Sequence, residues 1–303
     1  MKAFLKYIGF IVLVTALLAT LISISSLRAL RNASFYKPSF LANQVSETNF
    51  DYIVLGSSVG LTSLNTNRID SILGTKGLNL SMDDTGMSTH YLMLEHFLKE
   101  GKSTRYCILA PGLASLENKK AGFSNNDYRF LMYVQRDYVY DYYKNNPEAN
   151  NATNVLFLSK WVPFLGVGYY NTELFFPSLN AAIHPEQRNR FDARGNYGYP
   201  KKGDSLDGKE EIHTAISFQH PYLDKIETLC KNNNIRLIYY LSPIYKQTLS
   251  YEKPNFPLID HTQFFKEAGN FYDRIHVNSE GREKVSLQFA EEFKKIKKEN
   301  QLD

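Results

Sequence analysis

The stretch Asp51–Gly60, with the sequence DYIVLGSSVG, decides the fold that this sequence predicts. Its first half is an aromatic and aliphatic run, which is the composition of a strand buried on both faces of a sheet. Gly56 permits a sharp turn, and apolar residues then recur at roughly helical spacing from Leu61 onward. Ser57 and Ser58 therefore stand at a strand-to-helix turn, where open α/β sheets place their ligands. Backbone N–H groups at the start of that helix are suited to stabilise an oxyanion.

Strand and helix patterns alternate on both sides of this turn. After it, the predicted strands are 77–80, 106–109 and 235–241, and the predicted helices are about 88–99, one opening at 220–221, and about 279–298. Short connections between alternating strands and helices are typical of a parallel sheet. We therefore predict an α/β fold in which a parallel sheet of about five strands carries helices on both faces.

Residues 117–211 interrupt this alternation with a segment rich in tyrosine, phenylalanine and asparagine. The segment is too long for a simple loop, so we expect a mostly helical insertion or lid. Two interpretations stay open for its aromatic side chains. They form a small local core, or several of them line a cleft, where flat apolar faces with polar tips suit sugar rings.

The N-terminus contains an uncharged run from Ile8 to Ser26 that is closed by Arg28. A run of this length is sufficient to cross a bilayer as a helix. We predict a single-pass membrane anchor over residues 1–28, with the domain outside the cytoplasm. Residues 8–26 of this anchor are expected to form one helix that projects from the domain without packing into it. Cleavage as a signal peptide is the alternative, because Ser23-Ile24-Ser25 is a weak small-x-small match.

The rest of the chain is predicted to be a linker over 29–49, which is polar and carries Pro38, followed by one domain over 50–303. The chain has 35 basic and 31 acidic residues, a net charge of +4 that is too mild to indicate nucleic-acid binding. Two cysteines exclude a disulfide scaffold and a cysteine-rich zinc site. His90 and His96 lack a ligand spacing, so we predict neither a metal nor a cofactor.

Two short motifs stand at opposite ends of the predicted domain, Gly56-Ser57-Ser58 after the first strand and Asp273-x-x-His276 before the last helix. A hydroxyl is a poor nucleophile unless a base takes its proton, and an imidazole suits that role. A carboxylate on the other ring nitrogen fixes the tautomer and stabilises the imidazolium. The pairing therefore predicts a serine nucleophile with a histidine base, although each motif alone is common in turns and helix starts.

The sequence Gly56-Ser57-Ser58-Val59-Gly60 also fits the G-x-S-x-G elbow of α/β-hydrolases. That elbow follows several strands, whereas here only the predicted linker precedes the first strand. The arrangement instead resembles the SGNH (GDSL-like) hydrolase family, whose nucleophile follows the first strand and whose Asp-x-x-His lies near the C-terminus. The resemblance covers Asp51–Leu116 and Arg236–Phe293, and it implies a three-layer, flavodoxin-like fold.

By this resemblance Ser58 is the nucleophile, His276 the base and Asp273 the residue that orients it. The family's usual Gly-Asp-Ser block has Ser57 in place of the acid, as in many membrane-associated members.

The family's second block corresponds to 79–86. It implies oxyanion or substrate contacts from Asn79 and from Gly86 if the loop is shifted, whereas a plain alignment puts Asp84 at the glycine. Asn79 as a cap of the strand end is the alternative. The third block's Gly-x-Asn is replaced by Ala110-Pro111-Gly112.

As a whole, the sequence resembles membrane-anchored bacterial SGNH proteins that add or remove acyl groups on cell-surface polysaccharides. Three functions follow as expectations: an ester hydrolase acting on acylated saccharides of the cell envelope, an O-acyltransferase with the same three residues, or a non-catalytic surface protein. The implied partners are an acylated carbohydrate or acyl donor, and the membrane through the N-terminal helix.

Overall fold

The structure is a computed structural model that describes residues 1–117, 123–145, 153–201, 206 and 210–299. The chain divides into two compact units, and each is built from two separate segments. Met1–Ser46 and Asp127–Asn189 form the first, which we call the helical unit. Glu47–Asn126 and Arg190–Asp303 form the second, which we call the α/β unit.

The α/β unit contains a five-stranded sheet in which all neighbouring strands are parallel. In order across the sheet, the strands are β2 (Gly77–Asn79), β1 (Asn49–Gly56), β3 (Ser103–Ala110), β5 (Arg236–Leu241) and β7 (Leu258–Asp260). The register pairs Gly56 with Ala110, so β1 and β3 end at the same edge. The sequence-based prediction of a parallel sheet of about five strands is confirmed.

Alternate residues of each strand point to the same face of the sheet. On one face, these residues pack against the C-terminal helix. Tyr52 of β1 meets Phe293 of α11 (Ser279–Glu299) edge to face, with 5.4 Å between the ring centroids. α4 (Thr66–Leu73) adds Ile69 to the same buried cluster. Aromatic and branched side chains of β1, β3 and β5 continue this core across the sheet.

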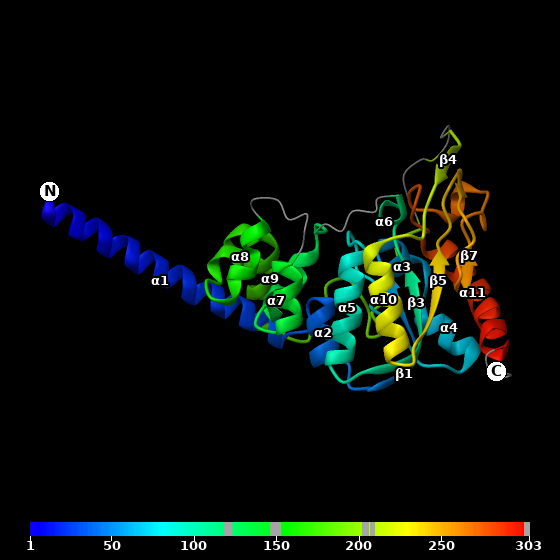
Figure 1. Ribbon diagram of the computed structural model, residues 1–303, viewed down its shortest axis with the longest axis horizontal. Coiled ribbons are helices and arrows are strands. Elements are labelled where there is room, and N and C mark those ends of the chain that lie inside the picture. Colours follow the sequence, from blue (N-terminus) through cyan, green and yellow to red (C-terminus); the bar gives the residue numbers. More distant parts are fainter. Residues whose placement is uncertain (118–122, 146–152, 202–205, 207–209, 300–303) are drawn as a thin grey trace. The chain divides into compact units, whose positions relative to one another are not determined.

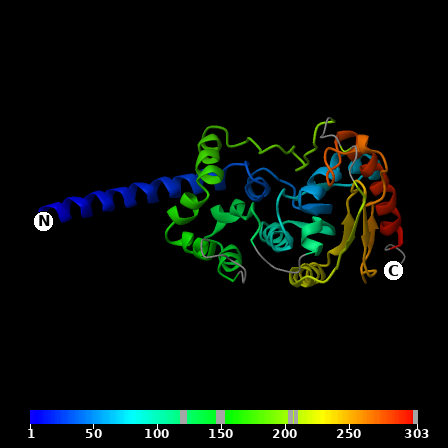
Figure 2. The ribbon, with the colours of Figure 1, turned by 90° about the horizontal axis from the view of Figure 1, so that it is seen from above.

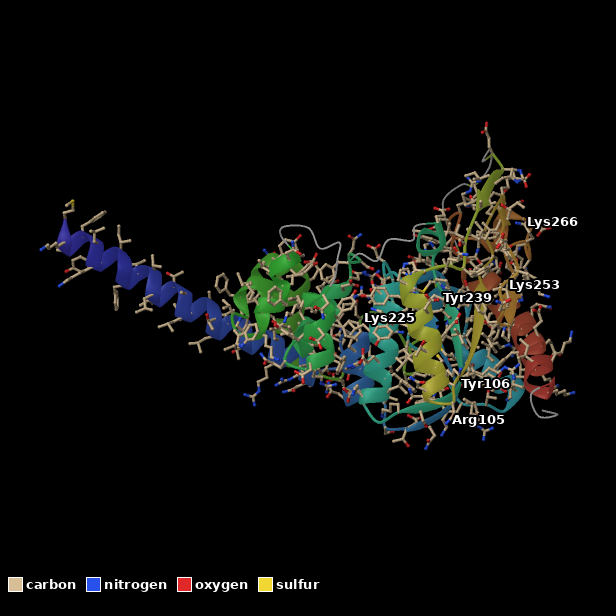
Figure 3. All side chains as sticks on the ribbon, viewed as in Figure 1. Arg105, Tyr106, Lys225, Tyr239, Lys253 and Lys266 are labelled. Carbon is tan, nitrogen blue, oxygen red and sulfur yellow. The ribbon has the colours of Figure 1, made fainter. Side chains whose placement is uncertain are left out.

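The opposite face of the sheet is covered by α5 (Met87–Lys99) and α10 (Pro221–Asn232), which lie side by side in Figure 1. Tyr91 of α5 and Tyr222 of α10 are in contact, with ring centroids 5.7 Å apart. Tyr239 of β5, labelled in Figure 3, is fully buried between strand and helix layers. Helices therefore flank both faces, as the alternating pattern predicted.

The remaining elements of the α/β unit are short. They are α3 (Ser58–Ser63), α6 (Leu113–Glu117), η3 (Ala268–Asn270), and the strand β4 (Ile212–Ala215), which pairs in parallel with β6 (Gln247–Ser250). α3 follows β1 without a connecting loop, and η3 lies a few residues before α11. Of the two motifs that the sequence analysis singled out, Gly56-Ser57-Ser58 therefore joins β1 to α3, and Asp273-x-x-His276 directly precedes α11.

The helical unit consists of helices and 3₁₀ turns. They are α1 (Lys2–Asn32), α2 (Lys37–Asn43), η1 (Asp127–Tyr133), α7 (Asp137–Lys144), η2 (Thr153–Lys160), α8 (Phe164–Tyr169) and α9 (Asn171–Ile183). The sequence analysis assigned residues 29–49 to a linker, whereas in the structure α1 extends to Asn32 and α2 follows with a buried Phe40. The predicted insertion, 117–211, is divided: 127–189 belong to the helical unit, whereas 117–126 and 190–211 belong to the α/β unit.

Helix α1 is the one helix of the described residues that is long and apolar enough to cross a membrane. Its N-terminal part stands clear of the other helices of its unit (Figures 2 and 3). The structure differs from the expectation of an unpacked anchor at the other end of residues 8–26, where Ser23 and Ser26 are buried. Small serine side chains allow neighbouring helices to approach closely there.

Candidate functional site

Ser58 is held at the carboxyl end of β1 by a turn that requires glycine. A Cβ on Gly56 would lie 2.0 Å from the carbonyl oxygen of Ala110 on β3, a backbone atom that cannot move aside. The N–H of Ser57 donates to that same carbonyl at 3.1 Å, which anchors the turn to the sheet. Ser58 is then the first residue of α3, and it is partly exposed.

Asp273 and His276 share a tight turn before α11. One carboxylate oxygen of Asp273 accepts the backbone N–H groups of Ile275 and His276, each at 2.9 Å. The side-chain oxygen of Asn278 then accepts the N–H groups of Glu280 and Gly281, so it caps the start of α11. The turn is thus fixed at both ends, and this fixes the imidazole of His276 between them.

The three predicted catalytic residues form one hydrogen-bonded chain. Nε2 of His276 lies 2.8 Å from Oγ of Ser58, and Nδ1 of His276 lies 2.8 and 2.9 Å from the two carboxylate oxygens of Asp273. Burial raises the pKa of Asp273, but the hydrogen bond and charge of His276 and the backbone donors outweigh it and hold that pKa below its usual range. An ionised Asp273 accepts Nδ1–H, which leaves Nε2 unprotonated and oriented to take the Ser58 proton.

The start of α3 supplies backbone donors next to this chain. The first bond within α3 runs from the N–H of Leu61 to the carbonyl of Ser57. The N–H groups of Ser58, Val59 and Gly60 precede it, so helix geometry provides no carbonyl for them within the helix. An oxyanion formed on a carbon attached to Ser58 Oγ would develop beside these donors.

Asn79, predicted as an oxyanion or substrate residue, is fully buried at the end of β2. Its side-chain amide donates to the carbonyls of Gly60 and Leu64, each at 3.2 Å, and its oxygen accepts the N–H of Ser81. These bonds tie the helix that carries Ser58 to the edge of the sheet. The observed contacts of Asn79 therefore match the alternative of a strand-end cap.

Gly86, the other predicted oxyanion residue, is the N-cap of α5. Its N–H donates to the hydroxyl of Ser124 at 2.6 Å. The loop before it is anchored near the turn, since the N–H of Met82 donates to the carbonyl of Gly56. An oxyanion contact from Gly86 requires its N–H to exchange the Ser124 hydroxyl for substrate.

Two stacked tyrosines that the sequence analysis did not single out lie next to the imidazole, and one of them contacts it. The ring of Tyr199 stacks on that of Tyr272, with centroids 4.2 Å apart and planes 7° from parallel. Tyr199 also meets the His276 ring edge to face at 5.2 Å. Burial, and then the charges of Tyr197 and Asp273, raise the pKa of the Tyr199 phenol, so it stays neutral. The available sequence signal was the Tyr-Gly-Tyr alternation at 197–199, inside a segment without regular structure.

A second histidine of the α/β unit has a different environment. His90 of α5 is fully buried, and its Nε2 lies 3.4 Å from the hydroxyl of Thr85. Its Nδ1 has no hydrogen-bond partner among the residues that the structure describes. Burial, and then the charge of His220, lower the pKa of His90 to about 3. His90 therefore remains neutral at ordinary pH and contributes to the core.

Comparison of the sequence with protein-family models and with curated proteins gave no match.

Proposed function

We propose that this protein is a serine-dependent ester hydrolase of the SGNH type that acts on acyl esters of cell-envelope saccharides, from a membrane anchor and with its α/β unit outside the cytoplasm. The observation that carries the proposal is the continuous chain Ser58 Oγ, His276 and Asp273, with heavy-atom distances of 2.8 to 2.9 Å. This is the arrangement in which a base activates a hydroxyl and a carboxylate orients the base.

Acylation begins when Ser58 Oγ attacks the ester carbonyl carbon. Nε2 of His276 takes the hydroxyl proton, and the ionised carboxylate of Asp273 stabilises the imidazolium that forms. The tetrahedral oxyanion is stabilised by backbone N–H groups at the start of α3. The bond to the alcohol oxygen then breaks, His276 returns its proton to that oxygen, and an acyl-serine remains.

Deacylation repeats these steps with water. His276 removes a proton from the water that attacks the acyl carbon, and the proton then passes to Ser58 Oγ as the acid is released. No further group is needed for the atoms and charges to balance. The same two half-reactions run with any alcohol in place of water.

A saccharide as substrate is supported by the tyrosine pair beside the imidazole. Tyr199 and Tyr272 are both partly exposed, and their stacked rings, each with a polar hydroxyl group, lie next to His276 through Tyr199. Such rings suit the apolar face of a sugar, and the hydroxyls suit its edge. The SGNH assignment is supported by the parallel sheet with the serine after its first strand and Asp-x-x-His before its last helix.

An O-acyltransferase is the second candidate, and the same pair of tyrosines favours it. His276 must deprotonate the group that attacks the acyl-serine, and Tyr199 touches His276 directly. A sugar seated on this pair would bring a hydroxyl to the base, in competition with water. The two candidates share the acyl-serine and differ only in what removes the acyl group.

The first test is turnover of an activated aryl acetate by the full-length protein in detergent. Ser58→Ala and His276→Ala should each lower kcat/KM by on the order of 10³-fold or more. The first removes the nucleophile, and in the second the hydroxyl stays protonated because it lacks its base. Ser57→Ala is the matched control. Its hydroxyl is buried and has no hydrogen-bond partner among the described residues, so most activity should remain. The melting temperatures should stay close to that of the wild type.

An added oligosaccharide then separates the two candidates. If it accelerates acyl-enzyme breakdown and is recovered in acylated form, the transferase is the function. Unchanged breakdown supports the hydrolase. Full activity of Ser58→Ala would contradict the proposal, because another group would then be the nucleophile. A wild type that is inactive on every ester while binding glycan would instead identify a non-catalytic surface protein.

A further inference from the structure

The segment Trp161–Ile183 of the helical unit has the composition of a membrane-associated region. Its 23 residues, WVPFLGVGYYNTELFFPSLNAAI, contain a single charged side chain, Glu173. Lys160 directly precedes the segment. The segment contains the helices α8 and α9. Surface helices of soluble units normally carry charged residues on the face that meets water.

Large apolar side chains lie on the surface of this segment. Their exposed fractions are Trp161 61%, Phe164 40%, Tyr169 48%, Phe176 60%, Leu179 50% and Ile183 72%. On α9 the buried positions are Leu174, Ser178 and Ala181, two of them small. Phe176, Leu179 and Ile183 of α9 therefore point outward, whereas an apolar side chain of a water-facing helix normally lies on its buried face. This pattern is typical of helices that face lipid.

Both helices pack on the part of α1 that belongs to the candidate span. α8 and α9 contact α1, and in Figures 1 and 2 they lie beside its C-terminal part. The uncharged stretch of α1 runs from Tyr7 to Leu27. At about 1.5 Å per residue it measures roughly 30 Å, the thickness of a bilayer's hydrocarbon core. The buried face of α1 includes Ser23 and Ser26, which lie inside this stretch.

The depth of α8 and α9 follows from these contacts. When Tyr7–Leu27 spans the hydrocarbon core, Ser23 and Ser26 lie just inside its boundary. Because α8 and α9 lie beside this C-terminal part of α1, they are at about the same depth, where acyl chains meet headgroups. The exposed side chains Leu21, Ile22 and Ile24 of α1 are lipid-facing at this level, so the apolar surface of α8 and α9 continues that of the span.

We propose that α8 and α9 are immersed in the interfacial layer of the bilayer next to α1. The membrane would then hold this protein through one spanning helix and a second, non-spanning pair of helices. The aromatic rings of Trp161 and Tyr169, with the ammonium of Lys160, suit the headgroup boundary. Lipid is the occupant that fits, because the surface is apolar, nearly uncharged and continuous with the candidate span.

The test uses the single tryptophan of the chain, Trp161. The full-length protein is reconstituted, without any other protein, into phosphatidylcholine vesicles whose acyl chains carry bromine near the glycerol end. Trp161 fluorescence should lose most of its intensity relative to vesicles without bromine, and aqueous iodide should quench it little. Phe176→Trp in a Trp161→Phe background should behave in the same way and report on α9.

A third tryptophan position is the matched control. Phe264 of the α/β unit has an exposed fraction of 39%, which is similar to the 40% of Phe164 in α8. Phe264→Trp in the Trp161→Phe background should be quenched by iodide and unaffected by bromine. Quenching of Trp161 and of the Phe176→Trp variant by iodide alone would overturn the proposal and indicate a surface that a partner protein covers. Equal bromine quenching at all three positions would overturn it too.

Discussion

Both units of this chain bury aromatic side chains, such as Tyr52 in the α/β unit and Phe130 in the helical unit, but the helical unit also exposes large ones. In the α/β unit, Tyr52, Tyr240 and Phe293 are fully buried in the layers between sheet and helices. In the helical unit, Trp161 and Phe176 are more than half exposed. Both segments are aromatic-rich in sequence, so composition does not distinguish a core from a surface. The exposed fractions of the side chains do distinguish them. They separate the α/β unit, which carries a polar site, from the helical unit, which has an apolar surface.

This difference predicts that the α/β unit carries the activity and the helical unit does not, which substitutions can test. Activity should depend on polar and aromatic residues at the sheet edge of the α/β unit. Matched changes in the helical unit should leave turnover unchanged. Each prediction below therefore pairs a residue of one unit with the same residue type in the other.

The largest effect on turnover is expected for Asp273→Asn, with Asp137→Asn as the matched control. The asparagine amide would present an N–H to Nδ1 of His276, which forces the proton onto Nε2, so that Nε2 no longer accepts the serine proton. We expect kcat/KM to fall by about 10²- to 10⁴-fold, and Asp273→Asn to cost nothing further in a Ser58→Ala background. Asp137 is 93% exposed, and its exchange should not change turnover. Losses that multiply in the double variant would contradict a single catalytic unit.

A smaller effect is expected for Tyr199→Ala against Tyr169→Ala. Loss of the ring removes one partner of the Tyr199 and Tyr272 stack, so KM for an acylated saccharide should rise about five- to tenfold. Turnover of an aryl acetate, which lacks a sugar, should change little, and Tyr199→Phe should restore the saccharide KM. Tyr169→Ala should leave both substrates unaffected. An equal fall of kcat on both substrates would indicate that Tyr199 positions His276 and binds no sugar.

The smallest effect concerns the pH dependence of stability, through His90→Asn against His184→Asn. The pKa of His90 is about 3 in the folded protein, below the value of about 6.5 expected when unfolded. Between these values only the unfolded state binds the proton, so stability is lost as pH falls, by about 1.4 kcal/mol per unit.

The measurement is the melting temperature at about pH 7.5 and about pH 5.5, an interval over which His90 contributes about 1.4 kcal/mol, or roughly 3–6 °C. His90→Asn should reduce the fall in melting temperature between the two pH values by this amount. His184 is exposed, so its exchange should leave the drop as it is in the wild type. The same drop in all three proteins would contradict a buried, neutral His90.

The sequence predicted the α/β unit well where local pattern and burial coincide. β1, β3 and β5 are continuous apolar runs, and parallel strands all end at one edge, so Ser58 and His276 could be paired across 218 residues. β7 has three residues, Leu258–Asp260, too few for a period to be visible. The strands of the core thus follow from composition, while the edge of the sheet does not.

The remaining features depend on contacts between distant residues. The N–H of Gly86 is bonded to Ser124, 38 residues away, and no spacing rule predicts that partner. Tyr199 reaches the site through a segment without helix or strand. The helical unit joins α1 to 127–189 through small residues such as Ser23 and Ala181, which carry no periodic signal of their own. Local periodicity cannot show which distant segments meet.

The most direct test of the central claim is the site at which a fluorophosphonate attaches. Phosphonylation requires a serine oxygen activated by a base, and two adjacent serines offer an internal comparison. Mass spectrometry of digested full-length protein should find one adduct, on Ser58 and not on Ser57, and none after His276→Ala. An adduct on another serine, or an unmodified wild type that is folded, would contradict the assignment of Ser58 as the nucleophile.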